Sequence, residues 1–369
     1  MKYYIIAGEA SGDLHGANLM KELYKKDPDA NIRFWGGDLM QQAGGTLVKH
    51  YRDLAFMGFA EVVQNLGTIL KNIKLCKEDI TAFAPDVIVF IDYPGFNMRI
   101  AKWAKTLGYK THYYISPQIW AWKENRIKAI KRDVDVMYII LPFEKEFYET
   151  KHNYKVEFVG HPLIDAIHNF KEQENGNFIT ENKLDSRPII ALLPGSRKQE
   201  ITKLLDVMLS VTGNFTEYQF VIAGAPGQDP EFYSRFLKPG VSIVYNKTYQ
   251  LLSHAYAALV TSGTATLETA LFKVPEVVCY KGGWVSYQIA KRILTLKFIS
   301  LVNLIMDKEV VKELIQGECN QKNLVKALTG ILHPENRANL LKHYDLLEKK
   351  LGGKGASEKA ADLIIRNLT

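Results

Sequence analysis

Cysteine is scarce in this sequence: the 369 residues include three, Cys76, Cys279 and Cys319, which stand far apart along the chain. None of them has a CxxC or CxxH spacing, which argues against a zinc site and against a disulfide framework. Free cysteines of this kind fit a reducing cytoplasm. Long apolar runs are also lacking, because no segment approaches the ~18 apolar residues that a membrane-spanning helix needs. We therefore expect a soluble or peripheral protein.

Acidic residues are in the minority, with 40 Asp and Glu against 47 Lys and Arg, so the formal net charge is +7. A basic surplus favours anionic partners, which include nucleic acid, phosphorylated ligands and anionic membrane, and the charge alone does not choose among them. A solvated basic surface with no binding role is the other interpretation. The hydrophobic content of 47% is ordinary for a globular protein. The length predicts about two domains.

Short apolar runs alternate with amphipathic stretches through most of the chain. Several runs are continuously apolar, which is typical of strands covered on both faces, as in parallel sheets. The first run is too short for a signal peptide and is followed at once by Glu9 and Asp13, so it favours a buried strand. The alternation predicts an α/β fold with doubly wound sheets. We expect strands at 3–7, 32–35, 87–91, 111–115, 136–140, 156–159, 189–193, 219–223, 242–245, 258–261 and 276–279.

A polar segment at 169–187 has no apolar strand, and a new strand follows Pro188. We interpret this segment as a linker between a first domain at 1–168 and a second at 186–344. Two helices are expected near the end of the chain, at about 335–351 and 358–368. Glycines separate them, and Ser357 is a plausible N-cap for the second.

The loop after the first strand carries four polar side chains in one turn, Glu9, Ser11, Asp13 and His15. Its glycines recur at every fourth position, which matches neither GxGxxG nor a Walker A loop, so a dinucleotide or ATP site is not indicated. Glycines would let a ligand approach the backbone closely. Helix capping by Ser11 or Asp13 is the alternative explanation.

Two further loops of the first domain follow strand ends. Asp92, beside Pro94 and Gly95, is a candidate general base, because burial in a partly apolar site would raise its pKa. An ordinary turn aspartate is the alternative. The second loop, SPQIWAW at 116–122, holds two tryptophans that must pack or bind something, and a basic run follows it. That run could face lipid phosphate or nucleic acid, and a solvated helix face is the alternative.

The second domain has two loops that suit phosphate. At 193–200 a strand ends, Pro194 and Gly195 form a turn beside Arg197, and a helix starts near Gln199. The N-terminus of a helix binds phosphate, and an arginine adds a bidentate donor that would stabilise a departing nucleoside diphosphate. At 261–270 a strand again runs into a turn of small residues and a helix that carries Glu268. Glu268 could bond a ribose or act as a capping-box acid.

Seven motifs in order resemble the lipid-A-disaccharide synthase family. They cover most of the chain and continue to SLVN at 300–303, where the family has SLPN. The motifs are GEASGD at 8–13, IDYPGFN at 91–97, SPQIWAW at 116–122, LPFE at 141–144, GHPL at 160–163, LPGSR at 193–197 and SGTATLE at 262–268.

The resemblance implies a GT-B type glycosyltransferase, with two Rossmann-like domains facing across a cleft and C-terminal helices, about 345–369, that return to the first domain. It implies the inverting transfer of a sugar from UDP-2,3-diacylglucosamine to 2,3-diacylglucosamine 1-phosphate, which releases UDP. No metal, cofactor or nucleic acid is implied. The enzyme would lie at the cytoplasmic face of the inner membrane as a peripheral protein, and its oligomeric state stays open.

Site roles follow from the matching positions. Asp92 and Arg197 are expected to be catalytic. The donor would contact Gly195, Ser196, Arg197, Ser262, Gly263, Thr264, Thr266, Glu268 and Asn303. The acceptor side would comprise Glu9, Ser11, Asp13, His15, Asn97 and Gln118. The pair Asp133 and Asp135 mimics the DxD metal motif, but it precedes a strand instead of ending one, so we reject it.

Amphiphilic substrates predict contact with a membrane surface. Residues 56–74 form the best candidate helix, whose apolar positions include Phe59, Val62, Val63, Leu66, Ile69 and Leu70, flanked by lysines. A core-facing helix is the alternative. Two other functions stay open at this point: another enzyme on the same scaffold, such as a UDP-GlcNAc epimerase or a lipid-linked GlcNAc transferase, and a non-catalytic binder of UDP-sugars or anionic lipid.

Overall fold

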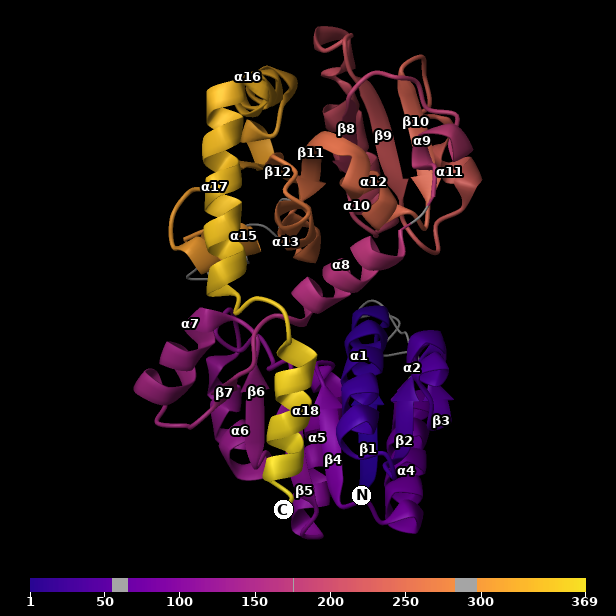
Figure 1. The fold of residues 1–369 in the computed structure, drawn as a ribbon, viewed down its shortest axis with the longest axis vertical. Helices are drawn as coiled ribbons and strands as arrows, with labels where there is room; N and C mark the ends of the chain where they lie inside the picture. The colour runs from indigo at the N-terminus through magenta and orange to yellow at the C-terminus, as the bar shows by residue number, and fades with distance from the viewer. Residues whose placement is uncertain (55–65, 175, 283–296) are drawn as a thin grey trace. The chain divides into compact units, whose positions relative to one another are not determined.

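The computed structural model describes residues 1–54, 66–174, 176–282 and 297–369. These residues form two compact units. Unit 1 comprises Met1–Ala166 and Leu351–Thr369, and unit 2 comprises Ile167–Lys350. Each unit contains one parallel sheet with helices packed on it (Figure 1).

In the described residues of unit 1, seven parallel strands follow the order β3-β2-β1-β4-β5-β6-β7. The strand order reverses between β1 and β4, and ligands of such sheets bind beyond the carboxyl ends of the strands near this point. The strands are β1 (Lys2–Ala7), β2 (Asn31–Gly36), β3 (Thr46–His50), β4 (Val87–Ile91), β5 (Lys110–Tyr114), β6 (Val136–Ile139) and β7 (Glu157–Phe158).

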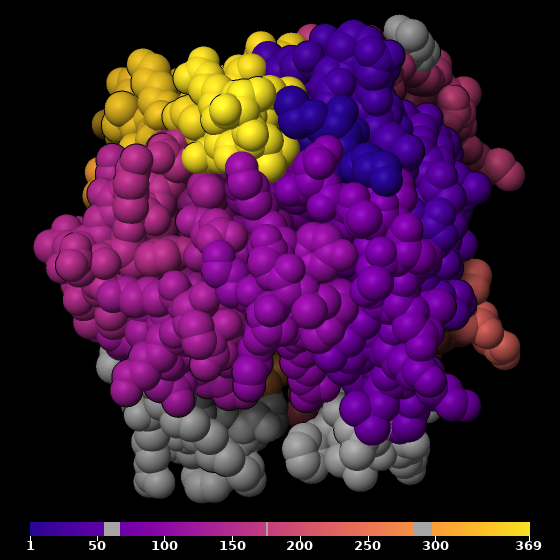
Figure 2. Space-filling view, turned by 90° about the horizontal axis from the view of Figure 1, so that it is seen from below, coloured from indigo at the N-terminus to yellow at the C-terminus, as the bar shows by residue number. Residues whose placement is uncertain are grey.

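Helices of unit 1 come from both ends of the chain. The last helix, α18, packs against α1, and the Lys26 ammonium lies 2.8 Å from the Asp362 carboxylate. Figure 2 shows the yellow C-terminal segment beside the indigo start of the chain. The helices are α1 (Ala10–Lys26), α2 (Asp38–Ala43), α4 (Leu66–Phe83), α5 (Pro94–Thr106), α6 (Ile127–Asp133), α7 (Pro142–Lys145) and α18 (Ala356–Arg366), and α8 (Pro162–Gln173) runs into unit 2.

The sheet of unit 2 repeats this topology with six parallel strands among the described residues, in the order β10-β9-β8-β11-β12-β13. The strands are β8 (Ile189–Leu193), β9 (Gln219–Gly224), β10 (Val241–Tyr245), β11 (Ala255–Thr261), β12 (Glu276–Tyr280) and β13 (Lys312–Ile315). The helices are α9 (Phe178–Glu181), α10 (Lys198–Leu209), α11 (Pro230–Ser234), α12 (Thr248–His254), α13 (Thr264–Leu271), α15 (Leu301–Met306), α16 (Gln321–Leu332) and α17 (Pro334–Lys350).

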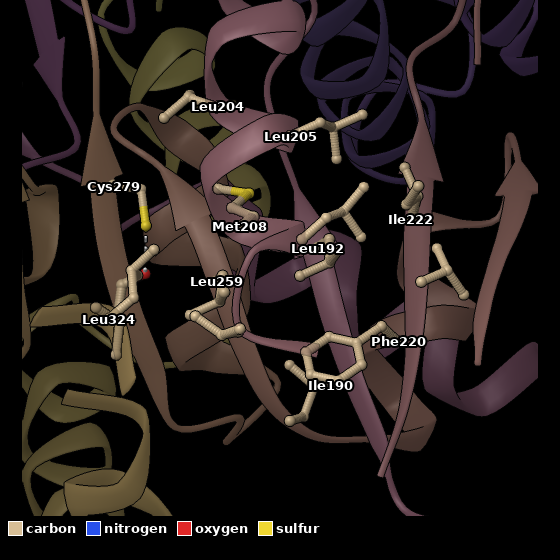
Figure 3. Close-up of a cluster of buried hydrophobic side chains, with 14 of the residues drawn as sticks. Ile190, Leu192, Leu204, Leu205, Met208, Phe220, Ile222, Leu259, Cys279 and Leu324 are labelled. Carbon is tan, nitrogen blue, oxygen red and sulfur yellow. Dashed lines mark hydrogen bonds between the residues drawn. The ribbon is translucent and has the colours of Figure 1, made fainter. Parts of the chain in front are cut away.

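A continuous apolar core lies between this sheet and the helices on one of its faces. Leu204, Leu205 and Met208 of α10 face Leu192 and neighbouring strand residues, and all of them are buried (Figure 3). Burial of apolar area of this kind is the main stabilising term of the unit. The core fixes the start of α10 at the carboxyl end of β8.

Every expected strand is present within three residues at each end, and the described residues contain two further strands that we did not expect. The missed strands, β3 and β13, form the outer edges of their sheets. Each has charged residues and is only partly buried. Edge strands of this kind lack the continuous apolar signal of central strands.

Two expectations about connections were wrong. The segment at 169–187, which we expected to be a linker, contains the end of α8 and all of α9. Ser357 is not the N-cap of the last helix, because Gly355 occupies that position. The cap comes instead from Asp165, whose carboxylate accepts the amide protons of Gly355 at 2.7 Å and Ser357 at 3.0 Å.

Candidate functional site

A pocket of about 370 Å³ opens in unit 2 beyond the carboxyl ends of β8, β9 and β11. Its size falls in the range of about 300–1,000 Å³ that small-molecule sites occupy. Both loops that we expected to bind the donor line it, so the structure brings them together. The lining residues are 193–197, 200, 223–226, 248, 261–265 and 268.

The first of these loops ends at the N-terminus of α10. Gly195 has φ of 100°, and a Cβ there would lie 2.5 Å from a carboxylate oxygen of Glu200, so the turn requires glycine. Arg197 is the N-cap residue and its side chain supplies no cap. Its guanidinium is exposed and forms no hydrogen bond with the described residues. The loop therefore presents a free cation and the positive end of a helix to the pocket.

The second loop ends at the N-terminus of α13. Its N-cap residue is Gly263, which has no side chain to cap the helix. The Ser262 hydroxyl donates to the carbonyl of Ile299 at 2.7 Å, so it holds the loop in place. Thr264 is exposed in the first turn. Two helix N-termini without side-chain caps thus line one pocket, an arrangement that favours an anion.

Two carboxylates also line the pocket. Glu268 accepts a hydrogen bond from the Tyr249 hydroxyl at 3.2 Å, and burial raises its pKa. Glu200 accepts one from the Thr261 hydroxyl at 3.3 Å, and burial raises its pKa against the opposing charge of Arg197. Sequence reasoning missed Glu200, although its place in the first turn after LPGSR was a signal.

Two residues expected on the donor side do not line this pocket. The Thr266 hydroxyl is buried and donates to the carbonyl of Gly263 at 2.8 Å. The Asn303 amide is fully buried, donates to Val311 and Glu313, and accepts from the backbone amides at 310 and 311, all within 2.9 Å. Thr266 and Asn303 therefore hold the backbone of unit 2 instead of presenting a side chain to the pocket.

In unit 1, Asp92 lies in a strained elbow between β4 and α5. Asp92 and Tyr93 have φ of 43° and 49°, a left-handed conformation that costs energy in residues other than glycine. Burial raises the pKa of Asp92 to about 6, and the negative charge of Glu9 adds to the rise. Backbone strain and a raised pKa at one carboxylate are the marks of a functional group.

Side chains behind the elbow hold its backbone. The Asn97 amide donates to the main-chain carbonyl of Asp92 at 2.7 Å, and the Tyr113 hydroxyl donates to the same carbonyl at 2.6 Å. Asn97 is completely buried. The amide group of Asn97 therefore supports the backbone that carries Asp92.

The loop after β1 divides into exposed and buried members. Glu9 and Ser11 are exposed. Asp13 is buried and caps α2, since its carboxylate accepts from the amides of Gly37 at 2.7 Å and Met40 at 3.0 Å. His15 is buried, and burial lowers its pKa to about 4, so it is neutral at pH 7. The alternative of helix capping therefore holds for Asp13, on a helix distant in sequence.

The loop at 116–122 is held by a buried acid that sequence reasoning did not select. Glu144 accepts hydrogen bonds from the Ser116 hydroxyl, from the Trp120 indole at 3.2 Å and from the Leu141 amide at 2.9 Å. Burial raises the pKa of Glu144 to about 7. The LPFE motif was the signal for it. Gln118 lies exposed at the tip of this loop.

The DxD-like pair has structural contacts. Asp133 is buried and pairs with the Arg132 guanidinium at 2.6 Å. Asp135 accepts from the Thr111 amide at 3.0 Å and pairs with Lys105. Both carboxylates are engaged within unit 1.

A family model described as lipid-A-disaccharide synthetase matches residues 3–365. The chain belongs to the lipid-A-disaccharide synthase family. A curated relative with that name from Syntrophus aciditrophicus is 39% identical, over 97% of this chain and 95% of the relative. Membership of this family identifies the chain as a glycosyltransferase of lipid A biosynthesis. The resemblance inferred from the seven motifs is confirmed.

Solved structures share the fold of this member of the lipid-A-disaccharide synthase family. A UDP-GlcNAc 2-epimerase from Neisseria meningitidis, bound to UDP-GlcNAc, has a TM-score of 0.71 at 13% identity and covers all of both chains. The glycosyltransferase of kitacinnamycin has a TM-score of 0.68 at 13% identity, over 100% of this chain and 99% of that one. The expected α/β fold of the GT-B type is confirmed.

Proposed function

We propose that this family member is an inverting glycosyltransferase that joins UDP-2,3-diacylglucosamine to 2,3-diacylglucosamine 1-phosphate and releases UDP. The observation that supports it most directly is the pocket of unit 2, where the N-termini of α10 and α13 and the guanidinium of Arg197 line one space. Such a site suits the diphosphate of a sugar nucleotide.

Unit 2 would bind the donor. Arg197 and the amides at 263–264 would contact the diphosphate, and Glu268 would bond the ribose. As the bond to the sugar breaks, the leaving UDP gains negative charge. A fixed arginine and two helix dipoles stabilise that charge more than they stabilise the bound donor, which lowers the barrier.

Unit 1 would supply the base. With its pKa raised to about 6, the carboxylate of Asp92 is still ionised at pH 7 and is more basic than an ordinary aspartate. It would accept the proton of the acceptor's 6-hydroxyl while that oxygen bonds to the anomeric carbon and UDP departs from the opposite face. This single displacement inverts the configuration and needs no enzyme nucleophile.

The decisive experiment is incubation of the purified protein with UDP-diacylglucosamine and diacylglucosamine 1-phosphate. Release of UDP with formation of a β-1,6-linked disaccharide supports the proposal. Two other outcomes contradict it: conversion of UDP-GlcNAc to an isomer without any acceptor indicates an epimerase, and donor binding without turnover indicates a binder.

We also propose peripheral contact with the cytoplasmic face of the inner membrane, where both acylated substrates would reside. None of the helices in the described ranges is long and apolar enough to cross a membrane. Of the residues expected to face lipid, Phe59, Val62 and Val63 lie outside the described residues, as does the side chain of Leu66. On α4, Ile69 is half-buried and Leu70 is 57% exposed.

Vesicle cosedimentation tests the membrane proposal with matched variants. Leu70→Glu should weaken binding to vesicles that contain anionic phospholipid, because it removes apolar area and adds a negative charge. Leu107→Glu is the control, since Leu107 is also 57% exposed but follows the C-terminus of α5. Equal loss in both variants, or loss in neither, contradicts a membrane role for α4.

A further inference from the structure

A second pocket, of about 270 Å³, lies in unit 1 between α5 and α6. This volume is below that of most sites that enclose a whole small ligand, so it suits one part of a larger molecule. Its lining is apolar apart from two arginines. The lining residues are Pro94, Gly95, Met98, Arg99, Pro117, Ile119, Arg126, Ala129 and Ile130.

The pocket adjoins the elbow that carries Asp92. Pro94 and Gly95 open α5 directly after Asp92 and Tyr93, and Pro117 belongs to the loop that follows β5. β4 and β5 are neighbouring parallel strands. The pocket therefore lies at the carboxyl edge of the sheet, where a parallel α/β sheet binds its ligand.

Within the described part of the chain, both arginines lack a protein counterion. Neither Arg99 of α5 nor Arg126, the N-cap residue of α6, forms an ion pair with any described residue, whereas Arg132 of α6 pairs with Asp133 at 2.6 Å. Their charges reach the elbow. Burial raises the pKa of Tyr93, and the charge of Arg99 opposes that rise. Burial also raises the pKa of Tyr113, and the charge of Arg126 opposes that rise.

The rest of the lining offers apolar surface. Ile119 and Ile130 are buried members of the core of unit 1, and Met98 packs against that core. A pocket with two guanidinium groups and an apolar wall matches an amphiphile in which a phosphate lies close to hydrocarbon, because guanidinium binds phosphate oxygens bidentately.

We propose that this pocket binds the phosphate monoester of the acylated sugar acceptor, with Arg99 and Arg126 on the phosphate and the start of an acyl chain on the apolar wall. The two arginines thereby select a phosphorylated acceptor and place its sugar beside Asp92. This inference rests on the proposed function, and it adds the group that distinguishes the acceptor from an unphosphorylated sugar.

The test compares two acceptors, diacylglucosamine 1-phosphate and the same lipid without phosphate. For each, kcat/KM is measured at saturating donor in the wild type and in Arg99→Gln/Arg126→Gln. Two charge-assisted hydrogen bonds predict that the wild type prefers the phosphorylated acceptor at least tenfold, and that the double variant loses at least tenfold of this ratio with donor KM unchanged. Arg99→Lys/Arg126→Lys should keep part of the preference.

The control is Lys102→Gln/Lys128→Gln, which removes the same charge from exposed positions on α5 and α6, the two helices that line the pocket. It should keep the wild-type ratio. A wild-type ratio in Arg99→Gln/Arg126→Gln overturns the inference, as does an equal fall in both double variants. If Arg99→Gln/Arg126→Gln loses only cosedimentation with phosphatidylglycerol vesicles and keeps its acceptor ratio, the arginines bind membrane phospholipid and the inference is wrong.

A failure of the proposed function can be distinguished from a failure of this inference. If the wild type forms no disaccharide, calorimetric titration with detergent-solubilised diacylglucosamine 1-phosphate alone still tests the pocket. Binding that weakens at least tenfold in Arg99→Gln/Arg126→Gln supports the inference, and unchanged binding overturns it. Thermal unfolding of each variant shows that the fold is intact, and the single variants Arg99→Gln and Arg126→Gln replace a double variant that does not fold.

Discussion

The ring of Tyr93 lies against the backbone of Gly8: a Cβ on Gly8 would stand 2.2 Å from the Cδ1 atom of Tyr93. Two non-bonded carbon atoms cannot lie that close, so one of them would have to move. Gly8, the residue after β1, therefore makes room for the left-handed elbow at Asp92 and Tyr93. Two of the family's motifs, GEASGD and IDYPGFN, meet at this contact.

Gly8→Ala should displace the Tyr93 ring and with it the elbow. We expect a loss of stability of about 1–3 kcal/mol from overpacking, and a fall in kcat because Asp92 moves. Urea denaturation and initial rates measure the two effects. Gly330→Ala is the control, because a Cβ on that glycine of α16 meets no atom within 4 Å. A normal kcat in folded Gly8→Ala would show that the elbow tolerates the shift.

Asp92→Asn should lower kcat by about 10² or more, because an amide does not accept the proton of the acceptor hydroxyl. UDP affinity should stay at the wild-type value. In the wild type, kcat/KM should fall about tenfold per pH unit below pH ~6, where Asp92 becomes protonated, and level off above it. An active Asp92→Asn enzyme would refute the base assignment.

Glu9→Gln should move the acidic limb of that pH profile to lower pH. The negative charge of Glu9 raises the pKa of Asp92 in addition to burial, so its removal lowers that pKa. Asp29→Asn removes the same charge at an exposed position between α1 and β2, and its profile should match the wild type. An acidic limb that stays in place in Glu9→Gln would mean that another group sets it.

Arg197→Ala should weaken UDP binding by roughly tenfold to a hundredfold, as expected for a lost charge-assisted hydrogen bond of about 1.5–3 kcal/mol. Arg197→Lys should recover only part of the loss, because lysine does not reproduce the bidentate geometry. Isothermal titration calorimetry with UDP measures both variants. Unchanged affinity in Arg197→Ala would remove the arginine from the diphosphate site.

Asp13→Ala should destabilise the protein by about 1–3 kcal/mol and leave the acceptor KM unchanged in the folded fraction. The substitution leaves the buried amides of Gly37 and Met40 without their acceptor. Urea denaturation is the measurement. Asp38→Ala is the control, since its ion pair with Arg52 is exposed and contributes little. A raised KM with normal stability would restore the acceptor-binding interpretation of Asp13.

The central strands could be predicted from the sequence because burial on both faces demands continuous apolar residues. β4 and β8 are completely buried and their observed bounds are those expected. The loops at 193–197 and 261–265 were also predictable, because glycine and small residues after a strand are local signals. The edge strands β3 and β13 give no such signal.

The roles of buried polar side chains were not predictable in the same way. Asp13 bonds to amides 24 and 27 residues away, and Glu144 bonds to Ser116 and Trp120, 28 and 24 residues away. Asn303 is likewise engaged by a later segment of the chain. A motif identifies such a residue as important, but only the fold shows whether its partner is a ligand or a backbone amide.

The capping of α18 by Asp165 has a consequence for the folding of the chain during its synthesis. Its two hydrogen bonds join residues 190 and 192 positions apart, across the whole of the contiguous unit 2. Domains usually fold in the order of their synthesis. Unit 1 begins with the first residues of the chain but is completed only by its last segment. The surface of unit 1 that α18 covers therefore stays open until that final segment has been translated.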